Sequence, residues 1–159
     1  MRRFRRALLA ALAAALILPS IALAYWPVAT TSSYVSQWYR DGHRGLDIAA
    51  PGGSKVMPMK YGIVVFAGWR SNCGGYQVWV RHNNGIYSAY YHLRSESVSK
   101  GQAVYGQQTA LGGVGATGCA TGNHLHMEVW KGYPWASGSY RVNPWVYVAG
   151  GTYFPVRYR

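Results

Sequence analysis

The stretch Gly118–Trp130, which reads GCATGNHLHMEVW, decides the fold that we expect for this chain. Two histidines, His124 and His126, flank one apolar residue, and the residues that follow them have the composition of a β-strand. Side chains alternate between the two faces of a strand, so both imidazoles would lie on one face and the neighbouring apolar residues on the other. One histidine would then be free to bind a metal while the other acts beside it.

The segments before this stretch also favour β-structure. Residues 62–69 form an apolar run, residues 76–82 alternate in polarity, and Asn83-Asn84-Gly85 is a hairpin signal ahead of residues 86–93. Loops and short strands are expected over residues 95–118. The pattern predicts a mainly β fold, a small antiparallel β-sheet domain.

The C-terminal part of the chain carries little regular pattern. No helical periodicity is found after the first 24 residues, so no helix is expected there. Residues 142–147, VNPWVY, are predicted to form a short turn that packs its aromatic side chains onto the sheet.

The first 24 residues differ from the rest. A basic head at residues 1–6 precedes an apolar run at residues 7–18 and the small residues Ala22-Leu23-Ala24, which is the pattern of a signal peptide cleaved after residue 24. The alternative is a retained membrane anchor, but a bilayer crossing needs ~20 apolar residues and this run is shorter. We therefore expect one domain, residues 25–159, exported to the periplasm or to the extracellular space and cell wall.

The charge of the chain indicates an anionic partner. The 159-residue chain has a net charge of +12, and removal of the four arginines of the signal segment leaves +8. A basic exported protein favours an anionic surface, for which cell wall and nucleic acid both qualify. Export makes nucleic acid the weaker candidate, so we expect an anionic cell-wall surface, no nucleic acid, and a monomer.

Two cysteines, Cys73 and Cys119, remain in the exported part. An even number in an oxidising compartment predicts a disulfide, which would stabilise the fold by ~4 kcal/mol through loop closure. Metal ligation is the alternative, but the wide separation and the lack of a CxxC pair argue against it.

A second candidate motif, HRGLD, contains His43 and Asp47 four residues apart. Neighbouring glycines make a helix unfavourable, so a turn or irregular strand would bring them together. Asp47 lies between two apolar residues and needs a strong partner, either an arginine or a metal, and His43 favours the metal. His43, Asp47 and one of His124 or His126 would form a three-ligand zinc site with an open fourth position. The HExxH and GxSxG motifs are absent.

These segments carry a resemblance. HRGLD with IAAPGG, GIVVFAGW, YQVWVRHNNGIYSAYYHL and GATGCATGNHLHMEV resemble, in that order, the lysostaphin-like (LytM-type) zinc endopeptidases of peptidase family M23. The match spans about residues 34–148. It implies a lysostaphin-type fold with long loops that form a groove, and hydrolysis of stem or cross-bridge peptides in bacterial peptidoglycan. It also makes a disulfide between the two cysteines plausible, because both of their loops would border the groove.

The resemblance also assigns roles to individual residues. It implies that His43, Asp47 and His126 bind Zn2+, and it matches His92 and His124 to the two further active-site histidines of the family. On this basis we hypothesise that the two further histidines orient or deprotonate the attacking water and pass a proton to the leaving amine.

Two more residues have open interpretations. Tyr39 precedes the first ligand and either supports the oxyanion or forms part of the groove wall. Glu128 would share a face with His126, where it forms a hydrogen bond to that ligand, pairs with an arginine, or is an exposed strand carboxylate. The alternative function is a noncatalytic cell-wall-binding or hydrolase-activating domain, which the presence of every expected ligand disfavours.

Overall fold

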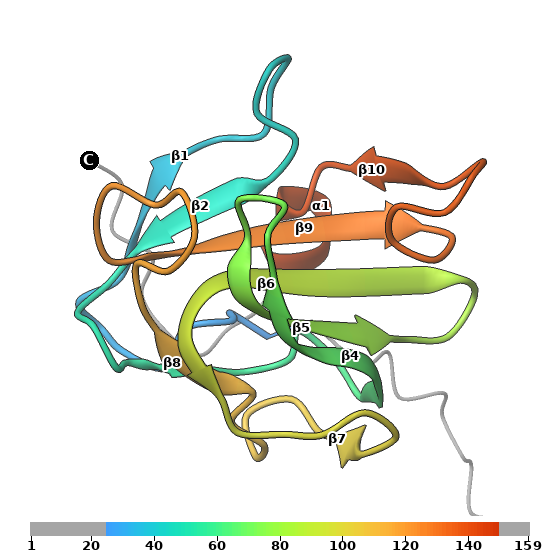
Figure 1. Cartoon of the computed structure of the whole chain (residues 1–159), viewed down its shortest axis with the longest axis horizontal. Helices are drawn as coiled ribbons and strands as arrows, with labels where there is room; N and C mark the ends of the chain where they lie inside the picture. The colour runs from blue at the N-terminus through green and yellow to red at the C-terminus, as the bar shows by residue number, and fades with distance from the viewer. Residues whose placement is uncertain (1–24, 150–159) are drawn as a thin grey trace, which may run out of the picture.

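The computed structural model describes residues 25–149, which form one antiparallel β-sheet with a single turn of helix (Figure 1). The elements are β1 Tyr34–Gln37, β2 Leu46–Ala49, β3 Lys55–Val56, β4 Gly62–Arg70, β5 Gly75–Arg81, β6 Ile86–Glu96, β7 Ala103–Val104, β8 Gly112–Val114, β9 His124–Lys131, β10 Tyr140–Val142 and α1 Trp145–Val148. The mainly β, antiparallel fold class expected from the sequence is confirmed.

The strand that carries both histidines lies in the middle of the sheet. The strand order is β1-β2-β9-β6-β5-β4-β7, while β10 pairs with β9 and β8 pairs with both β3 and β6. Figure 1 shows β9 between β2 and the long, curved β6. Because β2 begins at Leu46, within HRGLD, this order brings Asp47 of that motif onto the strand next to the one that carries HLH.

The predicted hairpin joins β5 to β6. Asn84 and Gly85 both have left-handed backbone, with φ of 60° and 68°, which is the conformation that favours Asn-Gly sequences in tight hairpins. His82 N donates to the Ile86 carbonyl at 2.8 Å and closes the turn. The expected meander of β4, β5 and β6 is therefore present.

The expectation of no helix is wrong for one short segment. α1 covers Trp145–Val148 and follows Pro144, while the Asn143 side chain accepts a hydrogen bond from Trp145 N at 3.0 Å. A single turn is too short to produce a helical period in the sequence. Trp145 and Tyr147 pack against the core as expected of this segment.

The two faces of the sheet have different roles. Leu125, Met127 and Val129 of β9 are fully buried in the main core, as the alternation in the sequence predicted. The opposite face carries His126, Glu128 and Trp130, the last of these within a smaller aromatic cluster. The main core thus fixes one face of β9 and leaves the other to the polar residues.

The predicted signal peptide, residues 1–24, lies outside the described residues, so its cleavage stays a prediction. Within residues 25–149 no helix is long and apolar enough to cross a membrane.

Candidate metal centre

The strand register aligns the polar residues across three strands. Asp47 of β2 is paired with His126 of β9, and Tyr91 of β6 is paired with His126 on the other side. All three side chains lie on the face opposite the main core. The sequence therefore brings the carboxylate and an imidazole together through ordinary antiparallel pairing, although they are 79 residues apart.

A tight loop places His43 beside this row. His43 and Arg40 form a two-way backbone bridge, and His43 Nδ1 lies 2.9 Å from the Trp38 carbonyl oxygen, to which it donates. Gly45 lies against His126, where an added Cβ would overlap the imidazole ring and approach the Met127 carbonyl at 2.9 Å. The glycine between the two ligands of HRGLD thus leaves the space that the third ligand occupies.

Donor atoms of His43, Asp47 and His126 converge within 4.8 Å of one another. Asp47 Oδ1 lies 3.1 Å from His43 Nε2 and 2.6 Å from His126 Nδ1. His43 Nε2 is buried and has no hydrogen-bond partner among the described residues. A buried lone pair and a carboxylate aimed at the same point fit a metal ion, which prefers neutral imidazole and ionised carboxylate ligands.

The protonation of this cluster also fits a metal ion. Burial lowers the pKa of His126, but hydrogen bonds with Asp47 and Glu128 outweigh it and raise the pKa to about 9. Burial would raise the pKa of Asp47, but His126 and the other two histidines near it lower it. Without a metal the cluster therefore keeps a proton, and a dication takes the place of that proton when it binds.

Glu128 faces Nε2 of His126, the ring nitrogen that points away from Asp47. Its Oε2 accepts hydrogen bonds from the Tyr91 hydroxyl at 2.6 Å and the Trp130 indole at 2.8 Å, and its Oε1 lies 3.3 Å from Arg141 and 3.5 Å from His126 Nε2. Glu128 is only 4% exposed, so its interpretation as an exposed strand carboxylate is wrong, and the arginine partner is confirmed. The reason is β10, which covers this end of β9 and brings Arg141 over it.

The two further histidines share one arrangement. Nδ1 of His92 lies 2.8 Å from the Thr117 carbonyl oxygen, and Nδ1 of His124 lies 2.9 Å from that of Gly122. A carbonyl can only accept, so each Nδ1 carries a proton, and Nε2 is the ring nitrogen that these two bonds leave available. The two ring centroids are 4.8 Å apart, and His124 Nε2 lies 4.0 Å from Asp47 Oδ2.

Irregular backbone directs His92 into the site. Its φ of 60° lies in the left-handed region, which is uncommon outside glycine and often marks functional positions. The pairing of β6 with β5 shifts register across this residue, between Tyr90 and Leu93, and the pairing with β8 shifts just after it, as at a β-bulge. Burial lowers the pKa of His92, with a further lowering from His124 and His126, so the ring is neutral at neutral pH.

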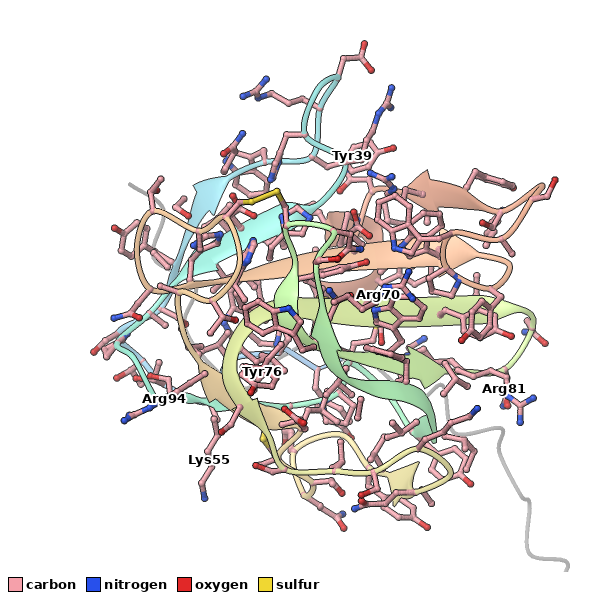
Figure 2. All side chains as sticks on the ribbon, in the orientation of Figure 1. Tyr39, Lys55, Arg70, Tyr76, Arg81 and Arg94 are labelled. Atoms are coloured by element: carbon pink, nitrogen blue, oxygen red, sulfur yellow. A yellow bond between two sulfur atoms is a disulfide. The ribbon has the colours of Figure 1, made fainter. Side chains whose placement is uncertain are left out.

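The loop that holds His92 is attached at several points. Cys73 and Cys119 form the expected disulfide, with Cα atoms 4.8 Å apart, which Figure 2 shows as the yellow bond. Thr117 Oγ1 donates to the Leu93 carbonyl at 2.7 Å and accepts from Tyr76 N at 3.1 Å. These contacts fix the carbonyl that orients His92.

Tyr39 lies at the rim of the site. Its hydroxyl donates to the Arg141 carbonyl at 3.3 Å and accepts from Arg44 at 3.4 Å. These contacts connect Tyr39 to β10, and its support of an oxyanion stays a prediction.

A cleft of about 160 Å³ opens beside the histidines. Tyr91, His92, His126 and Glu128 line it together with the Cys73 loop and Trp135. Trp135 was not singled out by the sequence as part of the site, because only the fold of the segment between β9 and β10 brings it here.

An antiparallel sheet that presents a His-Asp-His ligand set beside two further histidines is the arrangement of a metallopeptidase. The model of peptidase family M23 matches residues 41–144, which include all five of these residues. The chain belongs to peptidase family M23.

Relatives and solved structures agree with this family. The chain is 40% identical over 86 residues to the DD-carboxypeptidase/endopeptidase Mpg of Neisseria meningitidis serogroup B, and 38% identical over 86 residues to the peptidoglycan DD-endopeptidase ShyC of Vibrio cholerae. Each match covers 54% of this chain and 19% of the relative, so the chain matches about a fifth of the length of these curated relatives.

Two solved structures extend the likeness over most of the chain. A putative M23 peptidase from Pseudomonas aeruginosa superposes with a TM-score of 0.66 and 33% identity, covering 86% of this chain and 54% of that one. Lysostaphin from Staphylococcus simulans superposes with a TM-score of 0.70 and 25% identity, covering 82% and 54%. The lysostaphin-type fold is thus confirmed.

Proposed function

We propose that the protein is a zinc-dependent endopeptidase that hydrolyses peptide bonds in the stem or cross-bridge peptides of bacterial peptidoglycan. The observation that carries the proposal is the convergence of His43 Nε2, an Asp47 oxygen and His126 Nδ1, beside two further histidines whose Nδ1 atoms are engaged by backbone carbonyls. The peptidoglycan substrate is supported by the relatives, one of which is named a DD-carboxypeptidase/endopeptidase and another a peptidoglycan DD-endopeptidase.

The ligand set suits zinc. Two imidazoles and one carboxylate match the ligands that zinc takes in catalytic sites, where a fourth position stays open. Zinc in such a site supplies Lewis acidity, which polarises the scissile carbonyl and makes water nucleophilic near neutral pH. Glu128 faces His126 Nε2 and orients the ring so that Nδ1 points at the metal position.

The remaining histidines move protons. His92 and His124 each keep a proton on Nδ1 through a backbone carbonyl, so Nε2 accepts the proton of the attacking water. The same Nε2–H then donates to the leaving amine. The lowered pKa of His92 keeps it unprotonated and ready to accept.

Location and wall binding form part of the proposal. The basic head and apolar run at the N-terminus support export to the periplasm or the cell surface, and the net charge of the exported part supports attachment to an anionic wall. Binding to purified cell walls should weaken as ionic strength rises, because salt screens surface charges. Retention that does not change between low and high salt would contradict this part.

The function is tested with cross-linked muropeptides of known structure. The purified protein should bind about one equivalent of zinc. The zinc-bound protein should release fragments whose masses identify the cleaved bond, and a chelator should abolish this release. Intact muropeptides after long incubation with zinc would overturn the proposal and leave the noncatalytic wall-binding domain as the better description.

A further inference from the structure

A second, larger cleft of about 480 Å³ lies on the same face of the sheet. It is lined by aromatic, basic and small residues: Tyr39, Arg44, Trp130, Trp135, Ala136, Ser139, Tyr140 and Arg141. Two arginines and no acid are among these residues. The mechanism described above uses none of these side chains as a proton donor or acceptor.

This cleft continues the one at the histidines. Trp135 lines both clefts, and Trp130 follows His126 by four residues on the same face of β9. Four residues of a strand span about 13 Å. A peptide whose scissile bond lies at the metal centre would therefore reach the second cleft about four residues away.

Arg141 is held in a fixed position at the floor of the second cleft. Its guanidinium carbon lies 4.7 Å from the ring centroids of both Trp130 and Trp135, and its Nη1 lies 3.3 Å from Glu128. A guanidinium has five N–H donors, and Glu128 is its one acidic partner among the described residues. The stacked guanidinium thus has donors left for a ligand at little further cost in side-chain entropy.

Arg44 also lines the second cleft, and its ion pair is exposed to solvent. Its Nη2 lies 2.7 Å from Asp41, but the Asp41 side chain is 95% exposed and that of Arg44 is 48% exposed. Ion pairs this exposed contribute little to stability. A ligand carboxylate that enters the cleft replaces Asp41 as the partner of Arg44 without a large loss.

We propose that this cleft is a subsite for a carboxylate of the peptide substrate, bound between Arg44 and Arg141 over the Trp130–Trp135 floor. The inference rests on the proposed function and extends it, since it assigns a preference for stem peptides with free rather than amidated carboxylates. Both guanidinium groups line one cleft, and the acids that pair with them, Glu128 and the exposed Asp41, are not among its lining residues. Arg141 has N–H donors left and Arg44 can exchange its partner, so the pair provides charge complementarity for a carboxylate, and charged hydrogen bonds are stronger than neutral ones.

The test is the dissociation constant of a peptide that the enzyme does not cleave. The probe is the stem tripeptide L-Ala-γ-D-Glu-diaminopimelate, with its carboxylates free or converted to amides, titrated into the wild-type protein and into R44Q, R44K and R81Q. Arg81 ends β5 and is exposed, and Figure 2 shows it far from Tyr39, so R81Q removes one positive charge without touching the cleft.

We expect the wild-type protein and R81Q to bind the free form about tenfold more tightly than the amide, because one hydrogen bond to a charged group contributes about this factor to the dissociation constant. R44Q should reduce the ratio to threefold or less, and R44K should retain most of it. Equal binding of both forms by the wild-type protein, or an unchanged ratio in R44Q, overturns the subsite.

Cleavage of cross-linked muropeptides separates this outcome from that of the proposed function. A protein that cleaves both free and amidated cross-linked substrates equally well, with R44Q unchanged in KM, contradicts the subsite alone. A protein that shows the tenfold binding ratio but cleaves neither substrate contradicts the proposed function alone.

Discussion

Two neighbouring tyrosines of β6 belong to two different histidine networks. Tyr90 points into the main core, where its hydroxyl lies 2.9 Å from that of Ser88, and Ser88 lies 2.7 Å from His82 Nε2. Tyr91 points to the other face and donates to Glu128, which faces His126. Because neighbouring residues of a strand face opposite ways, these two tyrosines lead to two different histidines, the buried His82 on one face of the sheet and the half-buried His126 on the other.

The core network is closed and uncharged. His82 Nδ1 donates to the Tyr61 carbonyl at 2.8 Å, and Met59 N donates to the Tyr90 hydroxyl at 2.7 Å. Burial lowers the pKa of His82 to about 4, so the ring is neutral at neutral pH. Both ring nitrogens of His82 have hydrogen-bond partners. The network therefore connects its strands and leaves no ring nitrogen available for a ligand.

The network on the other face is charged and open. It contains two carboxylates, Asp47 and Glu128, and a buried His43 Nε2 that no described residue satisfies. Unpaired buried polar atoms cost free energy, so they persist where a ligand uses them. The comparison teaches that hydrogen bonding of the ring nitrogens distinguishes the two kinds of histidine better than burial does. Both nitrogens of the structural His82 have hydrogen-bond partners, whereas Nε2 of the candidate ligand His43 has none among the described residues.

The largest expected effect is on turnover. His92→Ala and His124→Ala should each lower kcat/KM by ~10²–10⁴, because each removes an Nε2 acceptor, while the zinc content stays near that of the wild type. His126→Ala should instead lose zinc, and His82→Gln should keep both zinc and turnover. Kinetics and metal analysis of the same preparations check this, and loss of zinc from either of the first two variants would refute the division of roles.

The next effect is on stability in acid. His82 has a pKa of about 4 when folded and 6.5 as its ordinary value. Between these values the unfolded chain binds a proton that the folded chain does not, so stability is full above pH 6.5 and falls as the pH is lowered toward 4. The loss is at most roughly 3 kcal/mol.

Urea unfolding near pH 7 and pH 4.5 measures this loss. Other groups also titrate over the range, so the informative quantity is the difference between the wild-type protein and His82→Gln. The variant should lose less stability on acidification. Parallel losses in the two proteins would show that His82 is not the neutral, buried group described above.

The smallest effect is on metal affinity. Glu128→Gln removes the charge that faces His126 Nε2 and should weaken zinc binding by about 10- to 100-fold, the range typical of residues that orient a ligand. Glu96→Gln, at the end of β6, is the matched control. Competition with a chelating dye compares the two, and equal affinities would mean that Glu128 only stabilises the sheet.

Most of the candidate ligand set was accessible from sequence because its parts are local. The motifs indicated His43, Asp47 and one histidine of the HLH pair, and the family resemblance selected His126 from that pair. HRGLD and HLH each bring two polar side chains close together, and the alternation around Leu125 predicted which face they share. Pairing of β2 with β9 then joined the two motifs. The resemblance to a family added His92, which no local pattern marks, since its direction depends on a left-handed backbone inside a strand.

Features that depend on distant pairing were predicted only in outline, since an arginine partner for Glu128 was one of three alternatives and its identity was not indicated. Glu128 is buried because β10 returns beside β9, and Arg141 reaches it only through that pairing. Period two places Glu128 on the face of His126, but nothing near it in sequence indicates that Tyr91 and Arg141 would enclose it. The single turn α1 was missed because four residues do not complete a measurable period.

The Cys73–Cys119 bond makes one attachment of the loop that orients His92 depend on the redox state of the compartment. Thr117, whose carbonyl orients His92, lies two residues before Cys119, so one attachment of that loop exists only after the two thiols have been oxidised. Thiols stay reduced in the cytosol and are oxidised outside it. With the export proposed above, the loop that orients His92 gains this last anchor outside the cytosol, where the two thiols are oxidised.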